Sequence, residues 1–354
     1  MCRCFIVVIA SLLFSVSCVR HDAENNREYK QIEGRLITIN GEPSLFKIHY
    51  ACDSLIITSS FSDTYKLTAY QLKSGICSSY DFLRIGNGPG EVHSVNVKFR
   101  IDTLYIVSYI PTGLSEFISI PLNSIKNENN WIRTRAERSM FVGGDFDVTD
   151  EGEHLLLGGD FDTQTLIIQF DGRNKTYSPL EFWPRDKYQG SHISKQMIYI
   201  PGSSLYSSGN KLLYASGEGH YALILDCSDA SSDEIILYDE FPKYSMSNDK
   251  INPRRISESK LGLYAYATDS LIYLTPIAGK LENGLYVPDN YKGYPPYFND
   301  IVDVFDWDGE YIISYITDIP FNNIYVNHSE NKLYTLSCNI TSMLSEIYVY
   351  DLIM

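Results

Sequence analysis

Short segments in which apolar and polar residues alternate recur along the chain at a nearly regular spacing. Each begins with an acidic residue or Asn and then alternates as a strand with one buried face does. Successive segments start 49 to 62 residues apart, at Asp53, Asp102, Glu151, Asn210, Asp269 and Asn331. A self-similar period in this range, built from short strands and turns, is typical of a β-propeller. Six openings predict six blades.

Further strands follow each opening. Third strands are expected over 67–75, 166–172, 221–226, 301–309 and 347–351, and fourth strands over 234–241 and 311–316. The last unit ends at its third strand, so we expect 35–39 near the N-terminus to supply the missing fourth one and close the ring without a free edge. The prediction is an all-β, six-bladed propeller closed by an N-terminal strand. A seventh blade would have to lie within one of the long insertions.

The first eighteen residues have the pattern of an export signal. Arg3 gives a basic start, Phe5 to Phe14 form a mostly apolar run, and small residues lead into Cys18. The run is too short for a mature membrane helix. The stretch resembles the lipobox of bacterial lipoproteins, although Ser15 stands where that family usually has Leu. We therefore expect a signal peptide over 1–17, lipidation at Cys18, a flexible tether over 18–33 and the propeller over 34–354; the alternative is an ordinary secreted protein.

A glycine-rich stretch lies between the first two units. It resembles the GxGPGE signature of the six-bladed, TolB-like propeller lipoproteins of Gram-negative bacteria, which are related in shape to NHL-repeat propellers. The matching residues are Gly86, Gly88, Pro89, Gly90 and Glu91, with Val92 where the family usually has an aromatic residue. The resemblance implies the fold and a periplasmic or cell-surface setting, and no settled activity. Since glycines allow positive φ and proline stiffens a loop, we expect a structural role, with ligand contact through Glu91 as the alternative.

Charge and cysteine content narrow the classes of partner. The chain has 44 acidic against 29 basic residues, a net charge of −15, which repels phosphate backbones and anionic lipid. We expect no nucleic acid partner and membrane contact through the lipid anchor alone. Beyond Cys18 the cysteines show no CxxC spacing, so a zinc site is not expected. Export permits disulfides, but buried free thiols explain the cysteines equally well; the residues are Cys52, Cys77, Cys227 and Cys338.

Propeller geometry places several long loops on one face. Loops from fourth to first strands share a face with loops from second to third strands, and four unusual segments fall there: 86–91, 182–205, 241–261 and 275–299. Such loops on a rigid scaffold commonly carry recognition. Their aromatic and polar residues could stack on a sugar or anchor a partner protein, or could simply pack on each other. The candidate binding residues are Glu91, Trp183, Arg185, Tyr188, His192, Tyr291, Tyr294 and Tyr297.

Signals for catalysis and metal binding are weak. The sequence has no nucleophile elbow and no HExxH motif, and its histidines are scattered; His93 and His220 are the candidates for a site in the central channel. A repeated acidic pattern occurs at 143–147 and 158–162. Two antiparallel strands around the turn at 150–153 explain that repeat better than calcium, because the EF-hand ligand order is missing. We predict no cofactor, while a metal ion in the channel stays open.

Three interpretations of function remain. The first is a non-enzymatic, lipid-anchored envelope protein that binds a protein, peptide or glycan through its loop-rich aromatic face. The second is a hydrolase or lyase with its site in the central channel, an expectation based on the precedent of the architecture alone. The third is a purely structural envelope component. We expect a monomer at the outer membrane, and the sequence leaves open which leaflet bears the anchor.

Overall fold

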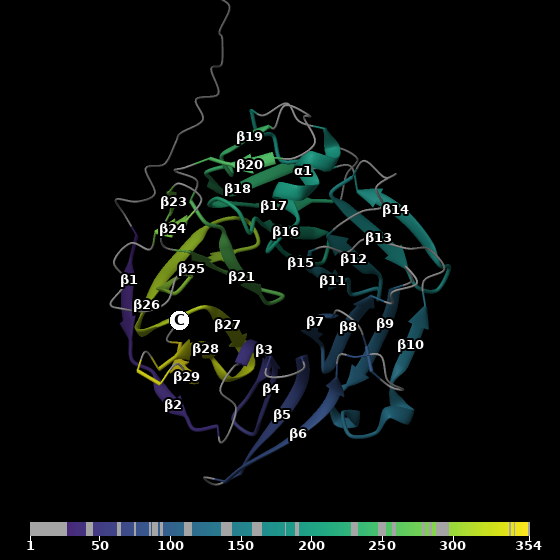
Figure 1. Ribbon diagram of the computed structural model, residues 1–354, viewed down its shortest axis with the longest axis vertical. Coiled ribbons are helices and arrows are strands. Elements are labelled where there is room, and N and C mark those ends of the chain that lie inside the picture. Colours follow the sequence, from purple (N-terminus) through teal and green to yellow (C-terminus); the bar gives the residue numbers. More distant parts are fainter. Residues whose placement is uncertain are drawn as a thin grey trace, which may run out of the picture.

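Six sheets surround a central axis in the part of the chain that the computed structural model describes (Figure 1). That part comprises residues 27–39, 45–61, 65–73, 76–84, 86, 91–92, 95–109, 115–135, 144–157, 165–180, 182–187, 191–227, 233–246, 253–256, 260–277, 280–282, 285–287, 297–339, 341–342 and 344–352. The arrangement is the predicted six-bladed β-propeller. Cys18 and the rest of the expected signal peptide lie outside the described residues.

Blades 1 to 4 are antiparallel sheets of four strands in chain order, with the first strand nearest the axis, and blades 5 and 6 each gain an outer strand from the N-terminal segment. The second strands coincide with the six alternating segments of the sequence. Blades 1 to 3 are β3 (Leu45–Ala51), β4 (Leu55–Phe61), β5 (Tyr65–Lys73) and β6 (Ile76–Arg84); β7 (Val95–Arg100), β8 (Thr103–Tyr109), β9 (Ser115–Pro121) and β10 (Ile132–Arg135); and β11 (Phe146–Val148), β12 (His154–Leu157), β13 (Ile167–Asp171) and β14 (Thr176–Leu180).

The last three blades contain β15 (Ser204–Ser208), β16 (Lys211–Ala215), β17 (Tyr221–Asp226) and β18 (Asp233–Asp239); β21 (Leu263–Ala267), β22 (Leu271–Pro276), β25 (Asn299–Asp306) and β26 (Tyr311–Phe321); and β27 (Asn323–Asn327), β28 (Lys332–Cys338) and β29 (Ser345–Asp351). Single-turn 3-10 helices occupy Leu122–Ser124, Glu128–Asn130 and His328–Glu330. The strands β11 and β12 pair around the turn at 149–153, as the sequence predicted.

The two ends of the chain close the ring. Strand β2 (Arg35–Ile37) pairs antiparallel with β29 and becomes the outermost strand of blade 6, with Leu36 opposite Tyr348. The prediction that an N-terminal strand completes the last blade is therefore confirmed. Closure leaves β29 without an open edge in the sheet.

The flexible tether was expected over 18–33, but its C-terminal part forms a strand. Strand β1 (Tyr29–Ile32) runs parallel to β26 and adds a fifth strand to blade 5. Just before it, Arg27 places Nη1 2.8 Å from the buried Asp303 carboxylate. The boundary was wrong because backbone pairing and one ion pair hold this segment, and neither leaves a hydrophobic pattern in the sequence.

Apolar residues fill the spaces between neighbouring blades. Ile57 and Leu67 of blade 1, for example, pack with Ile106 and Ile118 of blade 2, and all four are at most 1% exposed. Burial of a side chain of this size contributes about 1.5 to 3 kcal/mol. The core is therefore a ring of interfaces between blades, and it leaves the axis to the side chains of the first strands.

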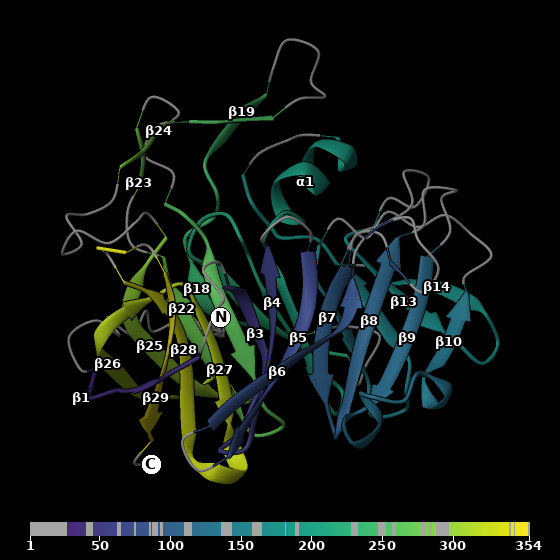
Figure 2. The ribbon, with the colours of Figure 1, turned by 60° about the horizontal axis from the view of Figure 1, so that its bottom comes forward.

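The long connections gather on one face, which we call the loop-rich face. Figure 2 shows helix α1 (His192–Tyr199) and the strands β19 (Tyr244–Met246), β23 (Lys280–Glu282) and β24 (Leu285–Val287) above the same side of the ring. Strand β20 (Pro253–Arg255) pairs with β19. Ser191 caps the N-terminus of the helix, and its Oγ accepts a hydrogen bond from the Ser194 N–H at 3.2 Å. Within the described residues, no helix has the length and apolar character needed to cross a membrane.

Candidate functional site

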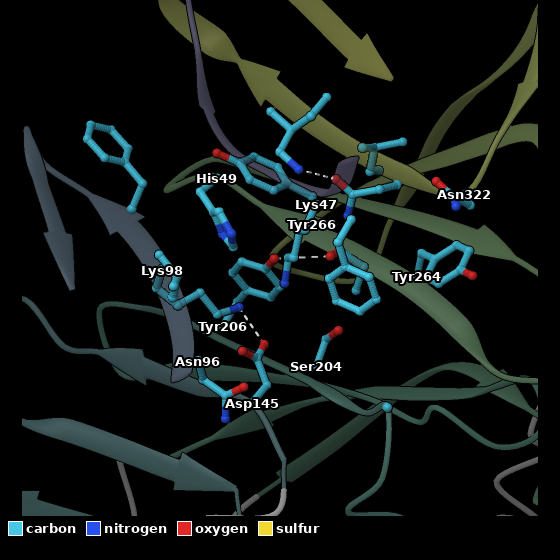
Figure 3. Close-up of a pocket in the computed structure, with 18 of the residues that line it drawn as sticks. Lys47, His49, Asn96, Lys98, Asp145, Ser204, Tyr206, Tyr264, Tyr266 and Asn322 are labelled. Carbon is cyan, nitrogen blue, oxygen red and sulfur yellow. Dashed lines mark hydrogen bonds and ion pairs between the residues drawn. The ribbon is translucent and has the colours of Figure 1, made fainter. Parts of the chain in front are cut away.

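A cavity of about 390 Å³ lies on the central axis. The first strands of the blades line it, and they all begin at the loop-rich face, so residues at their N-terminal ends form its mouth. Figure 3 shows charged and aromatic side chains converging on the cavity, among them Lys47, His49, Lys98, Asp145, Tyr206 and Asn322. Its volume falls in the range of small-molecule sites. The cavity is the candidate site.

Lys98 is held firmly inside the cavity. Its Nζ lies 2.5 Å from Oδ2 of Asp145 and 3.3 Å from the centre of the Tyr206 ring. The lysine side chain is 6% exposed and that of Asp145 is 11% exposed. The same carboxylate accepts a hydrogen bond from the Leu205 N–H at 3.2 Å. The carboxylate and the ring face together compensate a buried ammonium group.

Lys47 enters the same cavity from β3 without a comparable partner. No described side chain forms an ion pair with its ammonium group. Burial lowers the pKa of Lys47, and the nearby Lys98 lowers it further, while Asp145 acts in the opposite direction. Among the described lining residues, two lysines thus share one carboxylate, which gives this part of the cavity an excess of positive charge on a protein that is acidic overall.

His49 is buried beside the two lysines, with 6% of its surface exposed. Neither ring nitrogen has hydrogen-bonding geometry to a described partner. Burial holds the pKa of His49 well below 6.5, and the charge of Lys47 adds to that effect, while the backbone of Val97 acts in the opposite direction. The imidazole is therefore neutral near pH 7 and offers one nitrogen as an acceptor and the other as a donor.

Tyrosines position the remaining wall of the cavity. The Tyr206 hydroxyl donates a hydrogen bond to the Ala265 carbonyl oxygen at 3.0 Å, and its ring centre lies 5.8 Å from that of Tyr266. Tyr266 packs in turn on Tyr325, with centres 5.1 Å apart. Burial raises the pKa of Tyr206 well above its ordinary value, so this hydroxyl stays protonated and keeps its bond to the backbone.

The far end of the channel is crossed by an arginine. Nη1 of Arg100 lies 3.0 Å from Oδ2 of Asp147 and donates to the Ser207 carbonyl oxygen at 2.8 Å. Its Nη2 contacts Asp150 at 2.9 Å and Asp269 at 3.4 Å. These contacts join blade 2 to blades 3, 4 and 5. The arrangement narrows this end and leaves the loop-rich face as the entrance.

The glycine-rich loop has a structural arrangement where it is described. The N–H of Gly86 donates to the Val92 carbonyl oxygen at 2.9 Å, and the N–H of Val92 donates to Arg84 at 3.0 Å. The Glu91 carboxylate folds against Gly86, so close that a Cβ there would lie 2.0 Å from Oε2. A side chain at position 86 would therefore displace the Glu91 carboxylate from this position. Gly88, Pro89 and Gly90 lie outside the described residues.

The described members of the predicted aromatic surface lie outside the cavity lining. Trp183 is half-buried with its ring 5.3 Å from the exposed His192, while Arg185 is exposed and pairs with Glu234 at 3.1 Å. Tyr297 is 48% exposed. These residues belong to loops of the loop-rich face, and whether they bind anything stays a prediction. Tyr188, Tyr291 and Tyr294 lie outside the described residues.

The buried carboxylate of Asp186 holds part of the long insertion before β15 in place. The hydroxyl groups of Tyr199 and Tyr244 donate to Oδ2 of Asp186 at 2.6 and 2.9 Å, and Lys195 lies 3.1 Å from Oδ1. These bonds fix α1 and β19 to the loop that precedes the helix. Asp186 therefore supports the shape of the loop-rich face.

Of the two histidines predicted for the channel, only His220 belongs to the described residues, and it does not line the cavity. His220 lies in the turn between β16 and β17, with Nε2 3.2 Å from the Ile277 carbonyl oxygen, and His93 lies outside the described residues. Among described residues, no group of three or more His, Cys, Asp or Glu side chains could hold a metal ion. The four cysteines beyond Cys18 are all free thiols; they are Cys52, Cys77, Cys227 and Cys338.

The cavity residues were missed because the sequence pattern located second and third strands rather than first strands. A signal was present in Asn96, Lys98 and Arg100, which alternate with apolar residues along β7. Asp145 and Asp147 come from the acidic repeat, and the structure pairs them with Lys98 and Arg100. Alternating charge on an innermost strand indicates a polar channel.

Comparisons with known proteins show a similarity of fold and nothing more. No protein-family model matches the chain, and no curated protein matches it in sequence. Solved propellers are similar to it in shape. The structure of U3-55K has 9% sequence identity and a TM-score of 0.43, and the match covers 90% of this chain and 98% of that chain. The RRP9 WD40 repeats have 9% identity and a TM-score of 0.43, and the match covers 93% of this chain and 99% of that chain. The β-propeller domain of the trilobed protease from Pyrococcus furiosus has 11% identity and a TM-score of 0.40, and the match covers 88% of this chain and 96% of that chain. The chain is a six-bladed β-propeller, and likeness at this level carries no functional argument.

Proposed function

We propose that this protein is a lipid-anchored binding module of the bacterial cell envelope that captures a protein, peptide or glycan at its loop-rich face. The observation that carries the proposal is the central cavity of about 390 Å³ with its mouth at that face, in a channel whose far end is crossed by Arg100. A rigid ring with one polar, concave entrance is a usual form for a recognition site.

The anchoring part of the proposal rests on the sequence. The run from Phe5 to Phe14, the small residues before Cys18 and the GxGPGE-like stretch support an exported lipoprotein of the TolB-like propeller type. Replacement of the cysteine tests it: Cys18→Ser should move the protein from the membrane fraction to the soluble fraction and abolish incorporation of labelled fatty acid. Unchanged membrane association and labelling would refute the anchor without touching the binding site.

The binding part is tested by closing the entrance. Ser204 lies in the cavity wall where β15 begins, so Ser204→Trp should fill the mouth. Asn129, exposed in a turn on the opposite face, gives the control Asn129→Trp. Arrays of envelope glycans and peptides are probed with the wild type and both variants. We expect one class of array ligand to bind the wild type and Asn129→Trp but not Ser204→Trp. Binding that is the same in all three proteins, or no binding, would refute the proposal.

A second candidate, catalysis in the cavity, has one observation in its favour. Burial keeps His49 neutral next to Lys47, whose pKa is also lowered, and groups with perturbed pKa values cluster at active sites. The test is to incubate the protein with each array ligand that binds and to examine the mixture by mass spectrometry. Products that form with the wild type and disappear with His49→Gln would favour an enzyme.

A further inference from the structure

Three polar groups in the cavity are incompletely satisfied by the described residues of the protein. Lys47 has no ion-pair partner among the described side chains. Both ring nitrogens of His49 are buried without hydrogen-bond geometry, and the buried Oδ1 of Asn322 has no donor. Groups left in this condition cost free energy unless a ligand or water pairs with them. Together they describe what a well-matched ligand would carry.

The charges select an anion. Asp145 is already engaged by Lys98 and by the Leu205 N–H, so the ammonium of Lys47 remains to bind a negative group. A carboxylate there would form a charge-assisted hydrogen bond, which is stronger than a bond between neutral groups. The protein as a whole has a net charge of −15, so a preference for an anionic ligand comes from the side chains of the cavity and not from the overall charge.

The acceptors and rings select a hydroxylated ligand. Oδ1 of Asn322 requires a donor such as a hydroxyl, and Ser204 adds a further hydroxyl to the lining. Tyr264 and Tyr266 contribute aromatic surface to the same wall (Figure 3), and tyrosine rings suit the CH face of a sugar. Inorganic phosphate would leave this aromatic surface unused.

We propose that the central cavity binds a sugar acid, with its carboxylate at Lys47 and its hydroxyls at Asn322 and His49. The proposal rests on the proposed function, because it names the ligand class for the same entrance. A uronic acid could arrive as a free monosaccharide or as the end of a glycan chain. Both sources present the same carboxylate and ring hydroxyls.

Calorimetric titration of the full chain tests the assignment with matched probes. Glucuronate and glucose differ in the carboxylate, so glucuronate should bind at least about 10-fold more tightly, the ratio that corresponds to one charge-assisted bond. Methyl glucuronide imitates a chain end: binding equal to that of glucuronate assigns the site to glycan ends, and binding of glucuronate alone assigns it to the free acid. Equal binding of glucose, tighter binding of inorganic phosphate, or no binding of glucuronate would overturn the proposal.

Variants connect the binding to the cavity. Lys47→Met should weaken glucuronate binding by about 10- to 100-fold and leave glucose unchanged. Lys126→Met is the control for charge, since Lys126 is exposed on the opposite face over the Tyr80 ring. Equal loss in both variants would overturn the assignment. Thermal unfolding of each variant separates loss of binding from loss of fold.

The two proposals fail in different ways. If an array ligand depends on the open mouth while glucuronate does not bind, the sugar-acid assignment falls and the binding module stands. If glucuronate binds, Lys47→Met weakens that binding and no array ligand binds, the sugar-acid assignment stands and capture of a protein, peptide or larger glycan at the loop-rich face falls. If neither binds, both proposals fall.

Discussion

Lys98 and Tyr206 contact each other inside the propeller channel, with the ammonium nitrogen 3.3 Å from the centre of the ring. Lys98 belongs to blade 2 and Tyr206 to blade 4, and Asp145, just before the first strand of blade 3, completes the contact. Three blades are therefore joined at the axis by charge and aromatic packing. The same contact leaves Lys47 as the cation available to a ligand.

This contact predicts unequal effects for its two charged members. Asp145→Asn leaves the buried Lys98 with the Tyr206 ring alone and should cost about 3 to 5 kcal/mol of stability, as expected when one partner of a buried pair is removed. Lys98→Met should cost less, because Asp145 keeps the Leu205 N–H and the field of Lys47. Urea unfolding measures both. A smaller loss for Asp145→Asn than for Lys98→Met would contradict the described pairing.

Three glycines near the mouth allow close approach of the backbone and predict a steric effect. A Cβ at Gly217 would lie 2.4 Å from the Gly202 carbonyl carbon, and one at Gly262 would lie 2.1 Å from that of Gly217. Gly217→Ala should therefore destabilise the fold by about 1 to 3 kcal/mol. Gly172→Ala is the control, since its nearest neighbour is 3.8 Å away. Thermal unfolding should separate the two variants, and equal midpoints would argue against this contact.

Ring closure predicts that the N-terminal strands stabilise the propeller. A chain that starts at residue 40 lacks β1 and β2, exposes the edge of β29 and loses the Arg27 ion pair with Asp303. Compared with a chain that starts at residue 27, it should unfold at lower temperature and associate through the free edge. Calorimetry and light scattering test this. Identical midpoints and a monomeric truncated chain would show that closure contributes little.

His154 predicts an acid-sensitive component of stability. The ring packs 4.5 Å from that of Phe117, and burial lowers the pKa of His154 to about 4. In the unfolded chain the imidazole of His154 takes up a proton near pH 6.5, whereas in the folded chain it does so only near pH 4. The contribution of His154 to the stability is therefore full above pH 6.5, falls between about pH 6.5 and 4, and stays constant below; the loss is about 3 kcal/mol.

His154→Phe should flatten the stability curve between pH 6.5 and 4, with a residual slope from His49 and His220, whose pKa values burial also lowers. Urea unfolding at a series of pH values measures the change. Val302→Ala, in a core cluster that does not include His154, serves as the control, because it should lower the whole curve without altering its slope in this range. An unchanged slope in His154→Phe would contradict the assigned pKa.

The fold could be predicted because the second strands repeat a clear pattern. Asp53, Asp102 and Asp269 each precede an alternating strand. The last blade lacked a fourth strand in the sequence, which predicted that residues 35–39 close the ring, and β2 does so. Strand β1 could not be found in this way. Its sequence is polar apart from Ile32, and it is held by backbone bonds along β26.

The candidate site was less accessible to sequence reasoning. Strand β3 pairs with β4 through register shifts around residues 45–50, so the positions of Lys47 and His49 do not follow simple alternation. The aromatic loops attracted attention because long insertions are visible in a sequence. Convergence of Lys47, Lys98 and Asn322 depends on closure of the ring, which brings together residues far apart in the chain.

The most direct test of the account is a crystal structure of the protein with glucuronate. The account predicts a sugar acid within the cavity, its carboxylate in hydrogen-bonding distance of Lys47 Nζ and a hydroxyl donating to Asn322 Oδ1. An empty or water-filled cavity at saturating glucuronate, or a ligand bound away from the first strands, would contradict it.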